Sequence, residues 1–307
     1  MRFLHGMQPR LTAELKRLVA PLVEAGRLPA FVKIYIIRCS GLLDTAWYER
    51  ITGSHVGDEM AAAKRLVERA DESGHAINPL FNADWYRSRY GFTGSTADAL
   101  IHYMLIGEDA GRQPNPWFDP VFFRKYNKHY GKWRTSLASY WRNWQRNPDP
   151  HPHFDGAWYS WQYKDVIDGN TNPLAHFLIS GLADGREPNA YFSGHWYKST
   201  YADIRESGQN AAHHFCMFGA AEMRSPGPNF DTRRYAAEYP DYIASGLDPF
   251  GHFMAVGRAE GRNTGTRYLH LWELMTRKNE DHPAAGHPAT VVDVIVPVYK
   301  GLAETHT

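Results

Sequence analysis

The sequence predicts a mainly α-helical protein built from tandem helical-hairpin repeats of about 38 residues, a solenoid-like array, followed by a terminal β-strand from an incomplete α/β domain. The first observation is a motif that begins at Phe154 and returns at Phe192 and Phe230. A period in this range is typical of repeat architectures. The second is that apolar and aromatic residues within each copy follow helical spacing. The third is a β-branched run near the end of the chain.

The composition excludes several classes of protein. The 307-residue chain has a formal net charge of +1 and two cysteines, Cys39 and Cys216. A near-neutral chain has no field that attracts nucleic acid, and two cysteines make neither a disulfide framework nor a metal-ligand cluster. The most apolar run, 31–37, is far shorter than the roughly 20 residues of a membrane span. We expect a soluble, cytoplasmic protein without a transmembrane segment, with peripheral attachment to the inner face of the membrane as the alternative.

Residues 1–42 are predicted to form an N-terminal helical cap. Apolar residues recur at helical spacing from Leu11 to Val23, and Gly26 is typical of a helix end. Pro21 predicts a kink or two short helices. We interpret this segment as a cap over the first repeat, in preference to an anchor on a membrane surface.

Residues 43–265 contain the repeats, with units that start near 43, 81, 118, 154, 192 and 230. Each unit is predicted to form two helices. The first helix opens on a polar residue that can cap free N–H groups. An apolar residue before the cap and an aromatic residue five positions later occupy the hydrophobic-staple positions. The predicted caps are Asp44, Asn82, Asp119, Asp155, Ser193 and Asp231.

The second helix of each unit also has predicted start and stop signals. It is predicted to open at Asp98, Ser136, Asn172, Asn210 and Asp248 and to end near Gly111, Gly185 and Gly261. Met223 replaces this glycine in one unit. An earlier set of glycines indicates a bend or a close helix contact: Gly107, Gly181, Gly219 and Gly257.

Histidine and arginine also recur once per unit. The histidines are His102, His176, His214 and His252, and the arginines are Arg112, Arg186, Arg224 and Arg262. Equivalent residues of successive units cannot converge on one ion, because packed helices stand about 8–10 Å apart. We therefore expect no metal site, and a ring nitrogen bonded to backbone or to the next unit. The arginines are expected to meet helix C-terminal carbonyls, with an anion-binding row as the alternative.

The tryptophans fall into two groups. Those in repeat phase are expected to pack in the core or between repeats: Trp47, Trp85, Trp158 and Trp196. The other group lies in or beside the eroded unit that starts at 118: Trp133, Trp141, Trp144 and Trp161. Irregular core filling is the favoured interpretation of this second group. They are also the best sequence candidates for a platform that binds a glycan or a protein partner.

The C-terminal residues divide into three predicted segments. Residues 266–278 are expected to form a helix that caps the array, and residues 279–290, which contain two prolines, a linker. Residues 291–307 begin with the β-branched run that is typical of a buried parallel strand. Such a strand needs neighbours on both sides, so we expect the sequence to stop just inside an α/β domain.

The run Val292–Gly301 resembles the first strand of the family 2 glycosyltransferases, nucleotide-sugar enzymes of the GT-A fold. The match lies in its Pro-Val-Tyr ending, and the resemblance implies that Pro297 and Tyr299 lie near the donor nucleotide. The repeats resemble those found ahead of, or between, transferase domains in bacterial surface-polysaccharide proteins. The family's acidic metal-binding motif and catalytic carboxylate lie downstream of this strand. The resemblance therefore implies no catalytic residue and no cofactor in this chain; a divalent metal is expected only for the missing catalytic domain.

These observations leave three functional hypotheses. The first is the repeat region of a bacterial polysaccharide-building glycosyltransferase, truncated inside its catalytic domain and inactive alone, with a nucleotide-sugar donor and a glycan acceptor as partners of the parent protein. Its repeats would position the enzyme, the acceptor or a protein partner. The second is a free-standing glycan- or protein-binding scaffold without enzymatic activity. The third, an independent enzyme, is the least favoured because no complete site is present.

Overall fold

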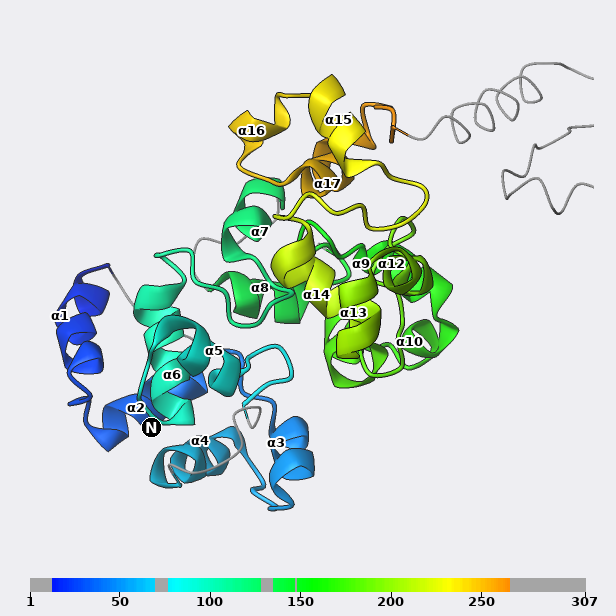
Figure 1. The fold of residues 1–307 in the computed structure, drawn as a ribbon. Helices are drawn as coiled ribbons and strands as arrows, with labels where there is room; N and C mark the ends of the chain where they lie inside the picture. The colour runs from blue at the N-terminus through cyan, green and yellow to red at the C-terminus, as the bar shows by residue number, and fades with distance from the viewer. Residues whose placement is uncertain (1–12, 70–76, 128–134, 147, 266–307) are drawn as a thin grey trace, which may run out of the picture. The chain divides into compact units, whose positions relative to one another are not determined.

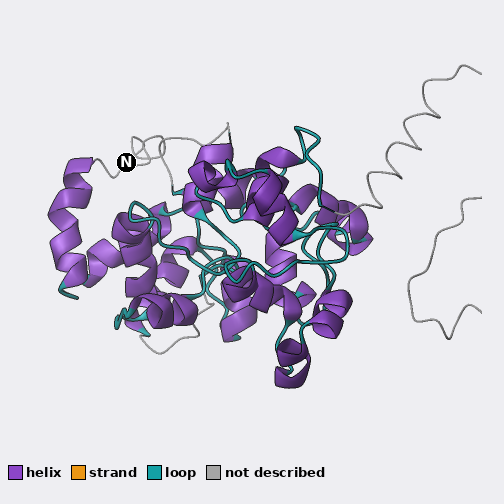
Figure 2. Cartoon of the chain, turned by 45° about the horizontal axis from the view of Figure 1, so that its top comes forward, coloured by secondary structure: helices purple, strands orange, loops and turns teal. Residues whose placement is uncertain are grey.

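A computed structural model of the chain describes residues 13–69, 77–127, 135–146 and 148–265. Within these residues the fold is mainly helical, as predicted, and none of them forms a strand (Figures 1 and 2). The predicted C-terminal helix, linker and terminal strand lie outside the described residues. The described part contains no helix that is both long and apolar enough to cross a membrane.

The described residues form 17 α-helices and four π-helical segments. The α-helices are α1 (Ala13–Glu24), α2 (Ala30–Cys39), α3 (Thr45–Thr52), α4 (Glu59–Glu68), α5 (Ala83–Tyr90), α6 (Thr96–His102), α7 (Pro120–Tyr126), α8 (Ser136–Asn143), α9 (Gly156–Gln162), α10 (Lys164–Asp168), α11 (Pro173–His176), α12 (Gly194–Thr200), α13 (Ala202–Ser207), α14 (Ala211–His214), α15 (Thr232–Glu238), α16 (Tyr242–Ser245) and α17 (Pro249–His252). The π-helical segments are η1 (Tyr103–Gly107), η2 (Phe177–Gly181), η3 (Phe215–Gly219) and η4 (Phe253–Gly257).

The N-terminal helices cover more than the first unit. The helix α1 is continuous through Pro21 and is followed by Gly26 in the left-handed conformation. It packs on α6 and η1, beside which it lies in Figure 1, while α2 packs on α4 and α6. The two helices therefore contact the unit that starts at 81 as well as the unit that starts at 43.

All six predicted caps of the first helices are confirmed. Asp44, for example, accepts a hydrogen bond of 2.9 Å from the amide of Trp47. The staple contact is also formed, with ring centroids of Phe154 and Tyr159 5.4 Å apart. Each such cap typically contributes about 1 kcal/mol to stability. The side chains that accept these capping bonds are Asp44, Asn82, Asp119, Asp155, Ser193 and Asp231.

Two of the five predicted starts of the second helix are wrong, one by three residues and the other by one. Asn172, Asn210 and Asp248 are caps as expected. However, α6 is capped by Ser95, with Asp98 at the third helical position of a capping box. The helix α8 is capped by Thr135 rather than by Ser136. In both cases an upstream hydroxyl accepts an amide hydrogen bond and starts the helix earlier.

The units that start at 154, 192 and 230 contain an additional short helix between the two expected ones. These are α10, α13 and α16. Before α10 and α13 the chain breaks at Tyr163 and Tyr201, which have extended backbone conformations. The two-helix description of a unit is therefore incomplete for these three.

The second helix of four units changes from an α-helical to a π-helical turn after its histidine. In η2 and the turn that follows, the amide of Leu182 donates to the carbonyl of Phe177 over 2.8 Å. Each π-helical segment ends on one of the earlier glycines. A Cβ atom placed on Gly107, Gly181, Gly219 or Gly257 would lie between 2.1 and 2.3 Å from a tyrosine hydroxyl. The predicted close contact is thus confirmed, and only glycine fits there.

The same tyrosine hydroxyl bonds to the histidine of its own unit. The hydroxyl oxygen lies 2.8 to 3.1 Å from Nδ1 in the pairs Tyr86–His102, Tyr159–His176, Tyr197–His214 and Tyr235–His252. Burial raises the pKa of Tyr86 and of Tyr235 to about 12 and lowers the pKa of the four histidines. The histidine partner is therefore a tyrosine hydroxyl, where backbone or the next unit was expected. We call each tyrosine, histidine and glycine set a Tyr–His–Gly contact.

The arginines do not meet helix C-terminal carbonyls in the way that was expected. Arg186 makes two hydrogen bonds to Asp165, of 2.9 and 2.8 Å, and its guanidinium lies 4.7 Å from the ring centre of Tyr163. The Tyr163 hydroxyl in turn accepts from the amide of Glu187. Arg224 and Arg262 make the same contacts with Asp203 and Tyr201 and with Asp241 and Tyr239. Arg112 lies over Tyr90.

Each unit also closes on itself, and units that are not consecutive touch. The amide of Asp155 donates to the carbonyl of Pro188 over 3.1 Å, which joins the two ends of one unit. Trp117, in the unit that starts at 81, packs edge-on against Phe177, in the unit that starts at 154, with ring centroids 4.9 Å apart. A third contact, from Lys125 to the carbonyl of Ser245, spans 2.9 Å. Contacts between nearest neighbours alone therefore do not describe the array.

The Tyr–His–Gly contact predicts a specific non-additivity. Gly219→Ala should cost at least about 1–3 kcal/mol of unfolding free energy, because its methyl group would overlap the Tyr197 hydroxyl. Tyr197→Phe should cost about 1–3 kcal/mol by leaving His214 unpaired. In the double variant the methyl group takes the place of the missing hydroxyl. Urea denaturation should therefore show that the double variant loses at least about 1 kcal/mol less than the sum of the two single losses. The control is Gly194→Ala, whose Cβ meets only ordinary contacts. Its loss should add to that of Tyr197→Phe.

The position of Met223 predicts a stabilising substitution. Met223 has φ +58°, where the equivalent Gly185 has φ +70°. Since a side chain is strained in this region, Met223→Gly should raise the unfolding free energy by about 1 kcal/mol. Gly185→Ala should lower the unfolding free energy by a similar amount, because its positive φ strains an alanine. Nothing lies within 4 Å of the added Cβ, so no new contact offsets this strain. Equal stability of both variants and the parent protein in urea would contradict the backbone explanation.

Candidate functional site

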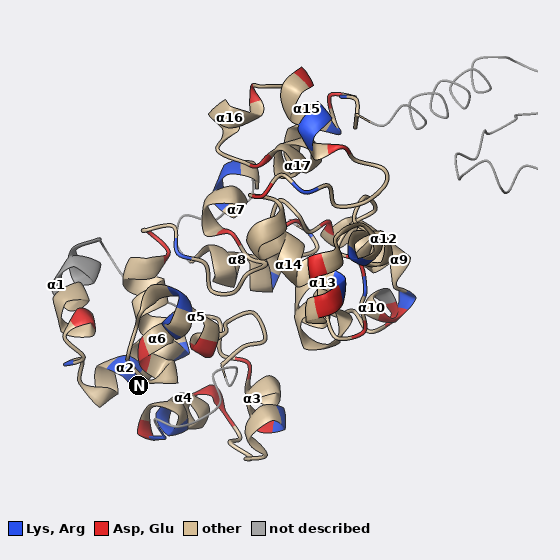
Figure 3. Cartoon of the chain, viewed as in Figure 1, with Lys and Arg blue, Asp and Glu red and all other residues tan. Residues whose placement is uncertain are grey.

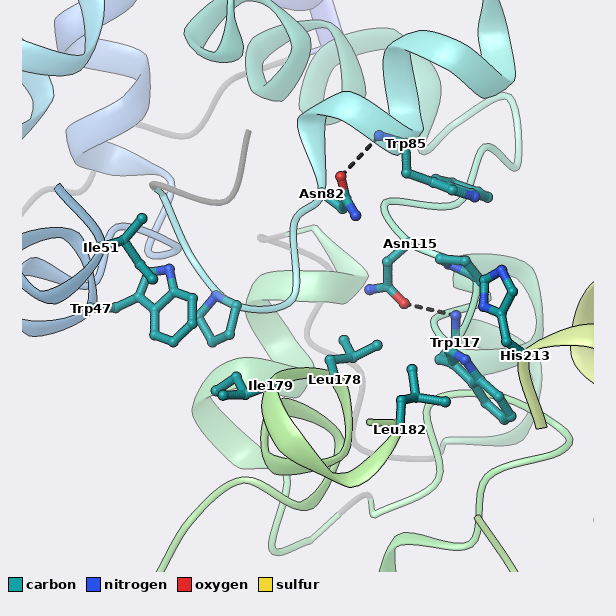
Figure 4. Close-up of a pocket in the computed structure, with 12 residues that line it drawn as sticks. Trp47, Ile51, Asn82, Trp85, Asn115, Trp117, Leu178, Ile179, Leu182 and His213 are labelled. Carbon is teal, nitrogen blue, oxygen red and sulfur yellow. Dashed lines mark hydrogen bonds between the residues drawn. The ribbon is translucent and has the colours of Figure 1, made fainter. Parts of the chain in front are cut away.

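A cavity of about 510 Å³ is lined by residues of four segments, which start at 43, 81, 154 and 192 in the sequence. Figure 4 shows that its wall comes from helices and loops far apart in the sequence. A volume of this size is within the range of about 300–1,000 Å³ that is common for ligand sites. The twelve lining residues are Trp47, Ile51, Pro79, Asn82, Trp85, Asn115, Pro116, Trp117, Leu178, Ile179, Leu182 and His213. We call it the aromatic cavity.

Two of its tryptophans occupy the same place in their units. Trp47 lies on α3 and Trp85 on α5, each two residues inside the helix start. The guanidinium of Arg50 lies 4.5 Å from the centre of the Trp47 ring. Trp85 meets Tyr90 edge-on at 5.9 Å, and part of its indole is exposed. These contacts fix both rings before any ligand arrives.

The third tryptophan, Trp117, comes from the loop before α7. It is completely buried, and its ring packs edge-on against Phe177 and His151 with centroid distances of 4.9 and 5.9 Å. Its backbone amide donates to the Asn115 side chain over 2.7 Å. Its indole Nε1 is buried with no hydrogen-bond partner among the described residues. An unpaired buried donor of this kind typically costs about 1–3 kcal/mol.

Two asparagine amides add polar groups to the aromatic cavity. The oxygen of Asn82 caps α5 by accepting from the Trp85 amide over 2.9 Å, and Figure 4 shows its amide nitrogen turned toward Asn115. Asn115 is buried and donates to the carbonyl of Leu80 over 2.7 Å. Both amides are thus held by backbone bonds, so their orientation is set by the fold.

The rest of the wall is apolar except for His213, whose pKa is lowered by desolvation so that the neutral ring is favoured. Leu178 and Ile179 belong to η2, and Leu182 follows it. Ile179 is 47% exposed, so an apolar side chain stands at an open edge. Lysines, arginines and acidic residues alternate over the helices in Figure 3, but none of them is among the lining residues. The composition of the wall therefore suits an uncharged ligand with both apolar and hydroxyl or amide groups.

The residues that sequence reasoning proposed as a platform lie elsewhere. Trp141 and Trp144 belong to α8 and its C-terminal end, and both are partly buried against the core. Trp161 is on α9 and is 70% exposed. Trp133 lies outside the described residues, as do Pro297 and Tyr299, the residues proposed to lie near a donor nucleotide.

The sequence pattern does not predict the aromatic cavity. Trp47 and Trp85 stand in repeat phase, which favours a packing role, and Trp117 lies outside that phase. Packing and lining are compatible: Trp85 touches Tyr90 and also keeps an exposed edge. Trp117 directly follows Asn115-Pro116 in the sequence. Trp117 and Leu178 line one cavity only because non-consecutive units pack together, which the sequence pattern does not predict.

A second, more polar cavity of about 220 Å³ contains two carboxyl groups, of the buried Asp155 and the partly buried Asp149. Burial, and then the charge of Asp155, raise the pKa of Asp149 to about 6. Asp149 accepts from the amide of Gly156 over 3.0 Å, while Asp155 accepts from Arg258 over 2.6 Å. Asp155 caps α9 and also accepts the hydrogen bond from Arg258, so both of its oxygens are engaged in structural contacts. We interpret this pair as part of the frame that joins two units.

The raised pKa of Asp149 predicts a pH-dependent effect. Between about pH 4 and 6 the folded protein keeps a proton that the unfolded chain has lost, so the stability from this group falls as pH rises through that window. Asp149→Asn keeps the acceptor for Gly156 and should raise the melting temperature at pH 7.5 but not at pH 4. Asp203→Asn is the control of opposite sign, because Arg224 lowers the pKa of Asp203; it should destabilise at pH 7.5. A pH-independent effect of Asp149→Asn would contradict this assignment.

The comparisons with known proteins found no match: no protein-family model, no curated protein and no solved structure is similar to this chain. A functional proposal therefore draws on the aromatic cavity, on the contacts that recur from unit to unit, and on the sequence resemblance described above.

Proposed function

We propose that this chain is a binding module that holds an uncharged glycan in the aromatic cavity. One observation carries the proposal: three indole rings and two fixed asparagine amides line one cavity that has no charged side chain in its wall. We further propose that the module is an array of six tandem helical repeats of about 38 residues. In this array the repeated contacts hold each unit, and the surfaces between units bind the ligand.

A sugar ring fits this wall better than a purely apolar ligand does. The C–H face of a pyranose can lie on an indole face, which buries apolar area on both partners. Its hydroxyl groups need hydrogen-bond partners, which the amide nitrogen of the partly buried Asn82 supplies, while the buried Asn115 holds the loop that carries Trp117. The apolar side chains of Leu178 and Leu182 would exclude water from the other side of the ring.

The wall also argues against a nucleotide-sugar ligand and against sugar transfer in this cavity. Phosphate groups are normally bound by arginine, lysine or helix N-termini, and no arginine or lysine lines the aromatic cavity. Acid–base catalysis of glycosyl chemistry uses a carboxyl pair, and the wall has no Asp or Glu. Binding without chemistry is therefore the activity proposed for this part of the chain.

The sequence resemblance supports a setting for this binding. Both the repeats and the run 292–301 resemble parts of bacterial proteins that build surface polysaccharides. We propose that the module holds an acceptor glycan for a cytoplasmic glycosyltransferase of this type, in which Pro297 and Tyr299 would lie by the donor. A free-standing glycan-binding scaffold is the alternative, and a glycan would occupy the same cavity in both cases.

The proposal predicts that Trp85 matters for glycan binding and that Trp196 does not. Trp196 has the same position in its unit and meets Tyr201 edge-on at 6.2 Å, but it does not line the aromatic cavity. An array of neutral and acidic bacterial oligosaccharides should identify a neutral binder, whose affinity is then measured by calorimetry. Trp85→Ala should weaken binding at least about tenfold, the effect of about 1.4 kcal/mol. Trp196→Ala should change it less than about twofold.

Three outcomes would contradict the proposal. One is that no oligosaccharide on the glycan array binds, while the chain captures a protein partner and Trp85→Ala abolishes that capture. The cavity would then be a protein-docking site. Another is equal loss of affinity in both tryptophan variants, which would indicate a general effect on folding. The third is a preference for acidic glycans or nucleotide-sugars, which the uncharged wall does not explain.

A further inference from the structure

Behind the wall of the aromatic cavity, three side chains that can ligate a metal converge. His151, His153 and Cys216 each offer one ligand atom, and these atoms lie within 4.8 Å of one another. The histidines are in the turn before α9, and the cysteine is inside η3. They come from units that are not consecutive, so the repeat-phase histidines gave no indication of this group.

One nitrogen of this group lacks a partner. His153 is 3% exposed, and its Nε2 lies 2.8 Å from a carboxylate oxygen of Asp248. The Nε2 proton is then directed at the carboxylate, which leaves a lone pair on Nδ1. That Nδ1 is buried and has no hydrogen-bond partner in the part of the chain that is described. Histidines that bind metals usually have this arrangement, with a carboxylate on the opposite ring nitrogen.

The other two ligands are close enough to complete a site. The sulfur of Cys216 lies 3.9 Å from Nε2 of His151 and 3.2 Å from the carbonyl oxygen of Pro116. Around a tetrahedral zinc ion, nitrogen and sulfur ligands lie about 3.5 Å apart. The separations of up to 4.8 Å are therefore about 1 Å longer than those around a bound ion, and the three side chains would move toward one another on binding.

Binding through His151 has an identifiable cost. Its Nδ1 accepts the amide N–H of His153 over 3.1 Å, which places the ring proton on Nε2. To bind a metal through Nε2, the proton must move to Nδ1, and the bond to this amide is lost. The Cys216 thiol must also release its proton to solvent. The hydrogen bond from the thiol to the Pro116 carbonyl is lost with that proton. Two hydrogen bonds of this kind are weak beside a metal–thiolate bond, so this cost does not exclude the site.

We propose that His151, His153 and Cys216 bind one Zn²⁺ ion, with Asp248 orienting His153. Two imidazoles and one thiolate suit zinc, which leaves a fourth position for water. The ion would join segments of two units, and Asp248, through its bond to His153, would add a third. It would also fix the ring of His151, on which Trp117 packs. The proposed site does not depend on what the aromatic cavity binds.

The test uses the full chain without an affinity tag, stripped with a chelator and titrated with zinc. We expect one zinc ion per chain by elemental analysis and a higher melting temperature on zinc addition. Cobalt(II) should give a thiolate-to-metal charge-transfer band. Cys216→Ala should weaken zinc binding at least tenfold and abolish the band. Cys39→Ala, which changes the other cysteine on α2, should bind as the parent protein does.

If Cys216→Ala does not fold, the cobalt spectrum of the unmodified protein still tests the proposal, because that measurement needs no variant. A cobalt complex without the charge-transfer band would overturn the proposal. So would a melting temperature that zinc leaves unchanged, or full zinc affinity in a folded Cys216→Ala or Cys216→Ser protein. Each of these results leaves the glycan proposal standing, since glycan binding is measured separately on the Trp85 variant.

Discussion

The fold depends on how closely a tyrosine hydroxyl approaches the glycine that ends each π-helical segment. In the unit that starts at 192, the Tyr197 oxygen fills the volume that a side chain at Gly219 would need, and it bonds to His214 at the same time. The wider π-helical turn brings the histidine and the glycine to the same oxygen. Because all three groups are buried, the contact is specific: an incorrect register would leave a polar atom unpaired in a low-dielectric interior. Four units repeat this contact with nearly the same distances.

Around this contact, polar bonds hold each unit, while ring contacts and a few polar bonds, such as that of Arg258 with Asp155, join different units. The Arg–Asp pair and its tyrosine lie at the surface of a unit, where solvent screens them and their net contribution to stability is small. Their geometry fixes the chain after each helix more than it stabilises the fold. The contacts between units are mostly rings, such as Trp117 with Phe177. The aromatic cavity and the His151–His153–Cys216 group both lie at these contacts between units.

Local features could be predicted from the sequence, and long-range ones could not. Caps such as Asp155 and staples such as Phe154 with Tyr159 depend on residues fewer than six positions apart, so the repeat revealed them. The need for glycine at Gly219 was also visible, although the π-helical turn was not, because a turn of this kind has no sequence signal of its own. The partner of Arg186 depends on the additional helix that carries Asp165, which the repeat pattern does not predict. Sites formed by non-consecutive units, including the one at Cys216, require the three-dimensional path of the chain.

The closure of each unit upon itself has a consequence for how such a chain can change over time. The bond from the Asp155 amide to Pro188 and the Tyr159–His176 pair lie inside one unit, so duplication or loss of a whole unit preserves them. The cavity wall, by contrast, is assembled from units at fixed offsets along the chain. A change in the number of units would therefore bring different side chains face to face while every unit kept its own frame. Under the proposed glycan-binding function, the binding site would then diversify by recombination while each unit kept the same fold.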